Sequence, residues 1–208
     1  MKRIYLVRHG ESTANSKEIK QGPDEPLSTH GRAQARFLAH RVERLPIDII
    51  IASPYVRTRQ TAEIILEHLK RPIEWCTDIV EKDQPKELIG LSYNDPRSLE
   101  ALRLIIENIN NPDWRYSDEE NFTEFRARGI RFLRHLEGRA EDHILVISHA
   151  AYIRLLLAIL IFGEDVTHKQ FGHLFVLMRN KNTGISVLDF DQEQKWIVQT
   201  WDDHAHLS

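Results

Sequence analysis

The sequence predicts an α/β fold: a three-layer sandwich with a mainly parallel central sheet, helices on both faces and antiparallel strands at one edge. Two observations support this prediction. Short, continuous apolar runs, Asp48–Ala52 and His143–Ile147, are typical of parallel strands that are covered on both faces. Segments with apolar residues at helical spacing alternate with these runs, and that alternation favours a parallel sheet.

The first part of the chain alternates strands with helices. Strands are expected at Arg3–Val7, Asp48–Ala52 and Ile73–Cys76. Between the first two, a helix runs to about Arg44 and takes Ser28 or Thr29 as its N-cap. The next helix should begin at Ser53-Pro54, with the serine as cap and the proline at the first helical position.

The second part of the chain continues the alternation of helices and strands and then ends in antiparallel strands. Helices are expected after the cap Asp95-Pro96, over Phe122–Glu137 before Gly138, and over Tyr152–Phe162, with a strand at His143–Ile147. The last forty residues predict three antiparallel strands, at Leu174–Met178, Ile185–Phe190 and Trp196–Trp201.

A length of 208 residues predicts one domain over residues 1–208. The stretch of about 77–121 is irregular and polar apart from one helix. We expect it to form a cap-like insertion over the sheet, where loops carry substrate specificity. Its candidate substrate contacts are the aromatic and basic residues Lys82, Lys86, Arg97, Trp114, Arg115 and Tyr116.

Charge and composition narrow the class of protein. Lys plus Arg total 28 against 31 Asp plus Glu, so no general attraction to nucleic acid or anionic membranes is expected. The most hydrophobic stretch, Ile144–Phe162, contains His149 and Arg154, and its longest uncharged run after these is Leu155–Gly163, far shorter than the about 20 residues of a membrane span. Cys76 is the single cysteine and is interpreted as a buried apolar side chain in a reducing compartment. We therefore expect a cytoplasmic protein without a nucleic-acid or membrane partner.

Three of the expected parallel strands end in polar residues. The first ends in Arg8-His9-Gly10, the second is followed by Ser53 and by a helix whose first turn holds Arg57, and another ends in Ser148-His149. Right-handed crossovers bring the carboxyl ends of parallel strands to one edge of the sheet, which is where ligands bind in open α/β folds. These segments are therefore expected to share one pocket.

The residues at these strand ends suit a phosphate monoester. Arginine guanidinium groups match phosphate oxygens in paired geometry, and two of them would balance its charge of about −1.5 to −2. Arg8 and Arg57 supply the two cations, Gly10 allows close approach of the backbone, and Asn15 could add an amide donor. Each residue alone is more often structural, so the prediction depends on their joint arrangement.

Several segments resemble the signatures of the histidine phosphatase superfamily, which has the phosphoglycerate-mutase-like fold. The matching stretches, in order, are VRHGESTAN, QGPDEPLSTHGRAQA, SPYVRTRQTA, VISHAAYIR, NTGISVLDF and DDHAHL. One departure is Ala150-Ala151, where the family commonly has glycine after the second histidine.

The resemblance implies a phosphohistidine mechanism without a metal or other cofactor. It assigns His9 as the nucleophile, and it assigns binding of the transferred phosphoryl group to Arg8, Arg57 and His149 with help from Asn15. It also implies that Gln21 and Gly22 lie near the substrate.

A leaving alkoxide needs a proton, and the resemblance implies a carboxylic acid after the third strand. The segment DIVEKDQPKELIG offers Glu81, Asp83 and Glu87. Glu81 fits the family's spacing best, and the other two remain alternatives. An acid that works at neutral pH is expected among apolar groups, which disfavour its charged form.

The reaction predicted is hydrolysis of a small phosphorylated metabolite, because mutases of this fold are longer at the cap and at the C-terminus. A phosphoglycerate-mutase-type phosphotransferase and a non-catalytic phospho-ligand binding protein remain alternatives. A metal hydrolase is disfavoured: His204 and His206 form an HxH pair, but no HExxH occurs and no carboxylate completes three ligands. The strand edge near Trp196 and Trp201 could pair with a second copy, so a homodimer is also possible.

Overall fold

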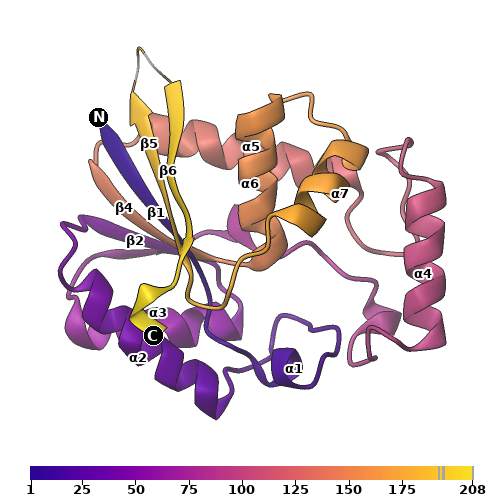
Figure 1. The fold of residues 1–208 in the computed structure, drawn as a ribbon, viewed down its shortest axis with the longest axis horizontal. Coiled ribbons are helices and arrows are strands. Elements are labelled where there is room, and N and C mark those ends of the chain that lie inside the picture. The colour runs from indigo at the N-terminus through magenta and orange to yellow at the C-terminus, as the bar shows by residue number, and fades with distance from the viewer. Residues whose placement is uncertain (192, 194, 208) are drawn as a thin grey trace.

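A mainly parallel sheet of six strands runs through the part of the chain that the computed structural model describes, residues 1–191, 193 and 195–207. Its strand order is β3-β2-β4-β1-β5-β6 (Figure 1). The strands are β1 (Lys2–Arg8), β2 (Ile49–Ala52), β3 (Ile73–Trp75), β4 (His143–Ser148), β5 (Ile185–Asp191) and β6 (Lys195–Asp203). The first four pair in parallel, and β5 and β6 add antiparallel strands beside β1. The predicted fold class is confirmed.

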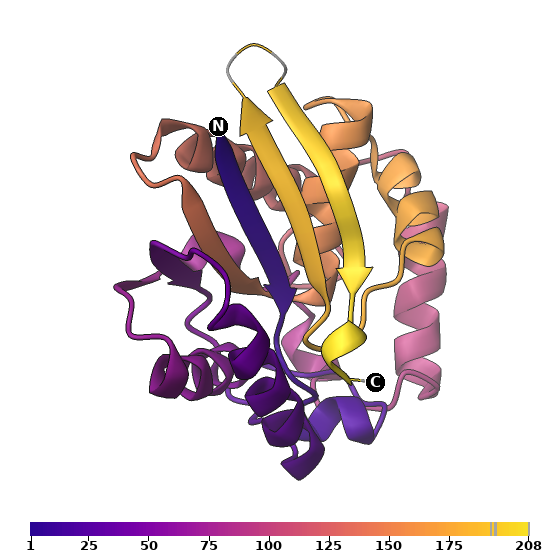
Figure 2. The same cartoon turned by 60° about the vertical axis from the view of Figure 1, so that its left-hand side comes forward.

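Helices cover both faces of this sheet (Figures 1 and 2). One face packs on α2 (Thr29–Val42) and α3 (Val56–His68), and the other packs on α5 (Phe122–Gly138), α6 (Ala150–Phe162) and α7 (His168–Leu177). Successive residues of β4 alternate between the two cores: Ile144 and Val146 belong to the α5–α6–α7 side, Leu145 and Ile147 to the α2–α3 side. Both faces of the strand are buried, which explains its continuous apolar sequence.

The very apolar helix α6 is buried between the sheet and its neighbouring helices. Its side chains from Ala151 to Ile159 are all buried. Helix α6 ends at Phe162, before Gly163, whose φ of 87° suits a residue without a side chain. Among the described residues, no helix is both long enough and apolar enough to cross a membrane.

Two predictions about the secondary structure are wrong. Leu174–Met178 is not a strand, because Leu174–Leu177 form the end of α7. Thr167 and Gln170 close a reciprocal capping box at the start of this helix, and Phe171 and Leu174 bury one face of it. This local start signal outweighs the β-propensity of the Phe-Val-Leu run.

The helix expected to begin at Ser53-Pro54 begins instead at Val56. Tyr55 occupies its N-cap without a side-chain hydrogen bond. The Ser53 hydroxyl accepts only a long local hydrogen bond, from the Tyr55 amide at 3.4 Å, and lies closer to His149 Nε2, at 2.8 Å. The shorter of its two contacts is therefore the tertiary one.

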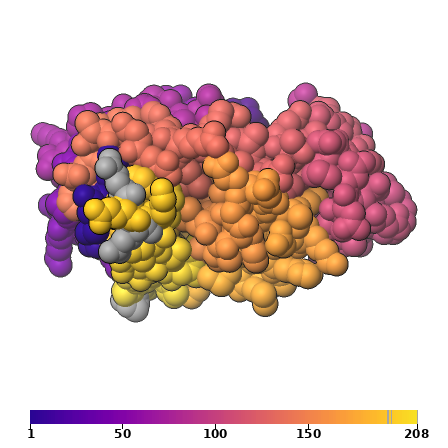
Figure 3. Space-filling view, turned by 90° about the horizontal axis from the view of Figure 1, so that it is seen from above, coloured from indigo at the N-terminus to yellow at the C-terminus, as the bar shows by residue number. Residues whose placement is uncertain are grey.

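The insertion of residues 77–121 forms a projection at one end of the molecule (Figure 3). It contains two 3₁₀ turns, Thr77–Ile79 and Lys86–Leu88, and α4 (Pro96–Glu107), which Asp95 caps as predicted. The buried face of α4 is Ser98 and Ala101, whereas its larger apolar residues are about half exposed: Leu99, Leu102 and Ile106. Backbone hydrogen bonds between Lys20 and both Gly90 and Leu91 tie the insertion to the loop after β1.

Strand β6 forms one edge of the sheet. The two indoles that mark it are engaged within the chain: Trp196 Nε1 donates to Glu137 Oε1 at 2.8 Å, and Trp201 Nε1 donates to the Arg179 carbonyl at 3.1 Å. Pairing of this edge with a second copy stays a prediction.

The loop after β1 packs against the first turn of α2 at two glycines. A Cβ on Gly10 would lie 2.5 Å from the Gly31 carbonyl oxygen, and a Cβ on Gly31 would lie 1.9 Å from the Glu11 carbonyl oxygen. Both neighbours are backbone atoms that cannot rotate away. Gly10 therefore serves close contact with α2, besides its expected role beside a ligand.

Gly31→Ala should destabilise the protein by about 3 kcal/mol, because the loop and the helix must separate to admit the methyl group. Urea unfolding followed by circular dichroism measures this change.

Gly138→Ala is the matched control, because a Cβ there has no atom within 4 Å. Its free energy of unfolding should change by less than about 1 kcal/mol. Equal effects at the two glycines would contradict this view of the loop.

Candidate active site

The carboxyl ends of β1, β4 and β2 lie level with each other. Arg8 pairs with Ser148, and Ala52 pairs with Ile147. The residue that follows each strand therefore emerges at the same edge of the sheet. There the His9 amide donates to the Ser148 carbonyl at 3.0 Å, and the Ser53 amide donates to the Ile147 carbonyl at 3.0 Å. The predicted convergence of the three strand ends is observed.

The His9 imidazole is held in one tautomer. Its Nδ1 lies 2.7 Å from its neighbour's carbonyl oxygen, that of Gly10, and a carbonyl can only accept, so Nδ1 carries the hydrogen. Arg57 Nε donates to His9 Nε2 at 3.2 Å, which requires a lone pair on that nitrogen. The ring is 1% exposed. Two independent contacts therefore leave the lone pair of the neutral ring on Nε2.

His149 lies beside His9 and is fully buried. The two ring centroids are 5.1 Å apart in an edge-to-face arrangement. His149 also forms the N-cap of α6 and contacts the Ser53 hydroxyl through Nε2. Its Nδ1 is buried and has no hydrogen-bond partner among the described residues.

Burial is the main reason that both imidazoles are hard to protonate. It lowers the pKa of His9 well below its usual value, and the positive charges of Arg57 and Arg8 lower it further. Burial likewise lowers the pKa of His149 well below its usual value, with Arg57 as the largest nearby charge. Both rings are therefore neutral at pH 7.

Arg57 projects from the first turn of α3 and is completely buried. Burial lowers its pKa to about 10, so the guanidinium stays charged at neutral pH. Its Nη1 donates to the Gly22 carbonyl at 2.7 Å, and its Nε contacts His9. Its Nη2 is buried and has no partner among the described residues.

Arg8 brings the second guanidinium to the strand ends. Its Nη1 donates to the Asn180 carbonyl at 2.7 Å, while its Nε is buried without a partner in the described chain. Arg8 Nε, Arg57 Nη2 and His149 Nδ1 are thus three unsatisfied buried nitrogens in one cluster. Because buried polar atoms are almost always hydrogen-bonded, these three fit an anion with several acceptor oxygens.

Glu81 lies at the amino end of α6, directly beside this cluster. Its Oε1 accepts hydrogen bonds from the Ala151 and Tyr152 amides, both at 3.1 Å. Its negative charge is also the largest favourable electrostatic interaction of both Arg8 and Arg57. The apolar surroundings expected for the proton donor are not found, because the carboxylate contacts amides and faces cations.

The two alternative carboxylates lie within the insertion. The Asp83 backbone amide donates to Glu120 Oε1, and burial raises the pKa of the Asp83 carboxyl. Glu87 is exposed in the second 3₁₀ turn. Of the three candidates, Glu81 is the one that interacts directly with the strand-end residues.

The remaining predicted site residues border the cluster through supporting contacts. Ser12 is the N-cap of α1 (Thr13–Ser16), and Asn15 closes its capping box, since Asn15 Oδ1 accepts from the Ser12 amide at 3.2 Å. Gln21 Oε1 accepts from the Ser12 hydroxyl at 2.8 Å. The contribution of Gly22 is its carbonyl, which orients Arg57. A Cβ on Gly22 would make only an ordinary contact, so the structure gives no steric need for glycine there.

Three positioning residues were not predicted from the sequence. Ser53 orients His149, Thr61 Oγ1 accepts from the Gly10 amide at 3.2 Å, and Asn182 Nδ2 donates to the His9 carbonyl at 2.9 Å. Thr61 follows Arg57 by one turn of α3, so helical spacing could have indicated it. Asn182 lies in the turn before β5 and is the first residue of the family-like stretch NTGISVLDF, but the resemblance was not used to give it a role.

The candidate substrate contacts of the insertion divide into two groups. Three exposed basic residues form ion pairs with carboxylates, at 2.8 to 3.3 Å: Lys86, Arg97 and Arg115. Lys82 differs, because its ammonium lies 6.0 Å from the Phe125 ring centroid and has no hydrogen bond to any described residue. Burial lowers the pKa of Lys82. Trp114 and Tyr116 are half-buried.

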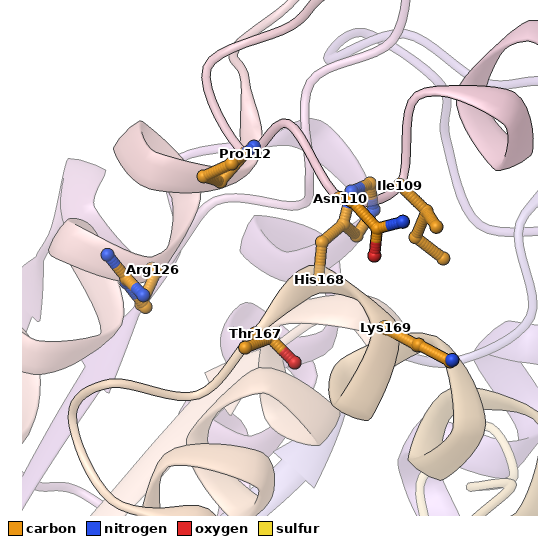
Figure 4. Close-up of a pocket in the computed structure, with 7 residues that line it drawn as sticks. All are labelled: Ile109, Asn110, Pro112, Arg126, Thr167, His168 and Lys169. Atoms are coloured by element: carbon orange, nitrogen blue, oxygen red, sulfur yellow. The ribbon is translucent and has the colours of Figure 1, made fainter.

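A cavity of about 400 Å³ lies away from the strand ends, between the segment after α4 and the start of α7 (Figure 4). Its polar lining is engaged in holding α7: Arg126 donates to the Val166 carbonyl, and Thr167 caps the helix. His168 stacks on Phe122, and burial lowers the pKa of this imidazole to about 4. The cavity therefore has a structural explanation and carries none of the chemistry described above.

Comparison with known proteins gives consistent matches along the whole chain. The family model for the Histidine phosphatase superfamily (branch 1) matches residues 4–204. An uncharacterized phosphatase, PhoE, of Bacillus subtilis is 30% identical over 210 residues, covering 100% of this chain and 98% of its own length. A probable phosphoglycerate mutase, GpmB, of Klebsiella pneumoniae is 30% identical over 221 residues, with 100% and 95% covered.

Solved structures share the fold at lower sequence identity. A putative α-ribazole-5′-P phosphatase of Escherichia coli aligns with a TM-score of 0.83 at 24% identity, over 98% of this chain and 97% of its own. YhfR of Bacillus stearothermophilus aligns with a TM-score of 0.84 at 21% identity over the full length of both chains.

The buried neutral histidines predict how stability depends on pH. His9 and His149 bind no proton in the folded state near neutral pH, whereas each binds one in the unfolded chain below about pH 6.5. Their contribution to stability is complete above that pH and is lost as the pH falls below it. The expected loss is at most about 1.4 kcal/mol per pH unit for each imidazole.

Urea unfolding between pH 7.5 and pH 5 measures this slope. His149→Asn removes one of the titrating groups and should reduce the slope by about one proton. Other histidines, such as His168, contribute equally to both proteins and cancel. Identical slopes would show that His149 is protonated in the folded protein.

Proposed function

Because the chain belongs to the histidine phosphatase superfamily, we propose that it hydrolyses small phosphomonoesters through a phosphohistidine intermediate on His9. The observation that carries this proposal is the fixed tautomer of His9. Its Nε2 lone pair lies within a cluster of two guanidiniums and a second imidazole that have unsatisfied donors. A nucleophile surrounded by preorganised positive charge is what phosphoryl transfer requires.

In the first step, the His9 Nε2 lone pair attacks phosphorus, and the bond from phosphorus to the ester oxygen breaks. The electron pair of that bond goes to the leaving oxygen, which takes a proton from Glu81 in its carboxylic acid form. Arg8 Nε, Arg57 Nη2 and His149 Nδ1 donate to the phosphoryl oxygens as their negative charge is redistributed.

In the second step, water attacks the phosphohistidine. The Glu81 carboxylate accepts a proton from this water, the bond from phosphorus to Nε2 breaks, and its electron pair returns to the imidazole. Inorganic phosphate leaves, and Glu81 is again an acid. The same residue serves as acid and then as base, so the cycle closes without a further group.

His149 is proposed to donate through Nδ1. If the Ser53 hydroxyl donates to Nε2 over the observed 2.8 Å, the hydrogen of the neutral ring lies on Nδ1. The ring is then neutral in the free enzyme and still offers one donor to the phosphoryl group.

We favour hydrolysis over phosphoryl transfer between metabolites, although several relatives are named probable phosphoglycerate mutases. The support for hydrolysis is the modest length of the insertion, since mutases of this fold are expected to carry a longer cap. Lys82, with no hydrogen bond to any described residue, is proposed to assist binding of an anionic metabolite.

His9→Ala should lower kcat/KM for p-nitrophenyl phosphate by about 10³-fold or more, because the substitution removes the nucleophile. The wild-type enzyme should keep its activity in EDTA. An active His9→Ala variant would overturn the phosphohistidine mechanism. Transfer of phosphate to glycerate from the phosphorylated enzyme, faster than to water, would favour the mutase alternative.

Glu81→Gln should lower kcat/KM by about 10²-fold or more for an alkyl phosphate, whose leaving alkoxide needs a proton. The effect on kcat/KM for p-nitrophenyl phosphate should be much smaller, because the phenolate leaves unprotonated and kcat/KM does not report the later hydrolysis of the phosphohistidine. Glutamine can still accept the α6 amide hydrogen bonds.

Asp83→Asn is the control for the proton donor and should change either rate less than about threefold. If Asp83→Asn instead shows the selective loss on the alkyl phosphate, then Asp83 is the acid and the assignment of Glu81 is wrong.

A further inference from the structure

Three potential metal ligands meet at the far ends of α2 and α3. Glu43 Oε2 lies 3.8 Å from His40 Nδ1 and 3.9 Å from His68 Nδ1. The two imidazole centroids are 4.6 Å apart. One ligand atom from each of the three residues lies within 4.8 Å of the others. The phosphatase mechanism uses none of these side chains.

Within the described chain, the Glu43 carboxylate lacks the cationic neighbours that a surface acid usually has. Among the described residues it has no lysine or arginine within ion-pair distance, although Arg44 follows it in the sequence. Its neighbours are the two imidazoles. A carboxylate flanked by two imidazole nitrogens suits a divalent transition-metal ion.

The backbone adds a second, independent attraction for positive charge. His40 lies in the last turn of α2, Glu43 is its C-cap, and His68 is the last residue of α3. The carboxyl end of a helix carries a negative partial charge and favours cations. Two such ends point to the same place.

We propose that His40, Glu43 and His68 bind a divalent transition-metal ion, Zn²⁺ in the first instance, which clips α2 to α3. Zinc takes imidazole nitrogen and carboxylate oxygen at about 2.0–2.2 Å, so ligand atoms of a tetrahedral site are about 3.3 Å apart. The observed 3.8 and 3.9 Å need only small side-chain rotations to close. Water would fill the remaining position, since the cluster is open to solvent.

The proposed ion has a structural effect and no place in catalysis. His68 follows Arg57 by eleven residues, about 16 Å along α3, so the two lie at opposite ends of that helix. The amino-terminal halves of α2 and α3 support the loop after β1: Gly31 packs against this loop, and Thr61 accepts a hydrogen bond from the Gly10 amide. Clipping the other ends would stabilise this pair of helices as a unit.

This metal site is not predicted from the sequence, because its three residues come together only in the folded chain. His40 and Glu43 lie three residues apart on one helix, which is a common spacing for an ordinary helix pair. His68 is distant in sequence and joins them only because α2 packs against α3. The pair His40 and Glu43 gains its third ligand, His68, only in the folded chain.

Calorimetric titration of metal-stripped protein with Zn²⁺ tests the proposal. One ion should bind per chain, and saturation should raise the thermal midpoint by about 5 °C. His40→Ala and His68→Ala should each weaken binding at least tenfold and remove the shift. Mg²⁺ should produce no shift, because it prefers oxygen ligands in octahedral geometry.

His30→Ala is the matched control, since His30 is an exposed histidine on the same helix but outside the cluster. It should bind zinc as the wild type does. All three ligand positions are at least partly exposed, so the variants should fold, and equal midpoints without metal will verify this.

Absence of zinc binding, or binding that His40→Ala and His68→Ala leave unchanged, would overturn the proposal. Neither result would touch the phosphatase proposal, because hydrolysis of p-nitrophenyl phosphate in EDTA is measured separately.

Discussion

The buried guanidinium of Arg57 is the constraint on which the rest of this structure depends. It is completely buried, it remains charged with a pKa of about 10, and Glu81 supplies its largest favourable electrostatic interaction. Burial of a charge is costly unless its donors find partners. Here the Gly22 carbonyl and the His9 lone pair take two of the donors. The cation, together with the Gly10 carbonyl, thereby fixes the tautomer of His9, and its charge adds to burial in lowering the pKa of that ring.

The surrounding fold maintains this unfavourable concentration of positive charge. Parallel strands end level with each other, so the backbone hydrogen bonds of the sheet fix where Arg8, His9 and His149 emerge. Arg57 comes from the first turn of α3, and the glycine contacts hold the loop after β1 against α2. Functional sites commonly hold such strained or destabilising features, which the rest of the protein offsets.

Glu81 links the charge balance of the site to its geometry. The same carboxylate stabilises the amino end of α6, where His149 is the N-cap, and faces both guanidiniums. The N-terminal partial charge of α6 and the two arginines all attract anions. A phosphoryl group that enters this field would therefore lie in the same positive field as the Glu81 carboxylate.

The site residues could be predicted from the sequence to the extent that they follow strands. Strand periodicity marks β1, β2 and β4, and the rule that parallel carboxyl ends meet then brings His9, Arg57 and His149 together. The residues that orient them were not predictable in this way. Ser53 was interpreted as a helix cap because its local pattern fits one, yet its hydroxyl contacts an imidazole 96 residues away.

What the sequence by itself determined is the α/β class, the order of most elements and the ligand-binding edge, because hydrophobic period and capping residues act locally. The sequence predicted a strand at Leu174–Met178, where α7 ends, because a short apolar run fits a strand or a helix until its packing partners are known. Only the tertiary structure decided the tautomer of His9, the surroundings of Glu81 and the meeting of His40 with His68. Each of these depends on distances between segments that are far apart in the chain, and only packing sets such distances.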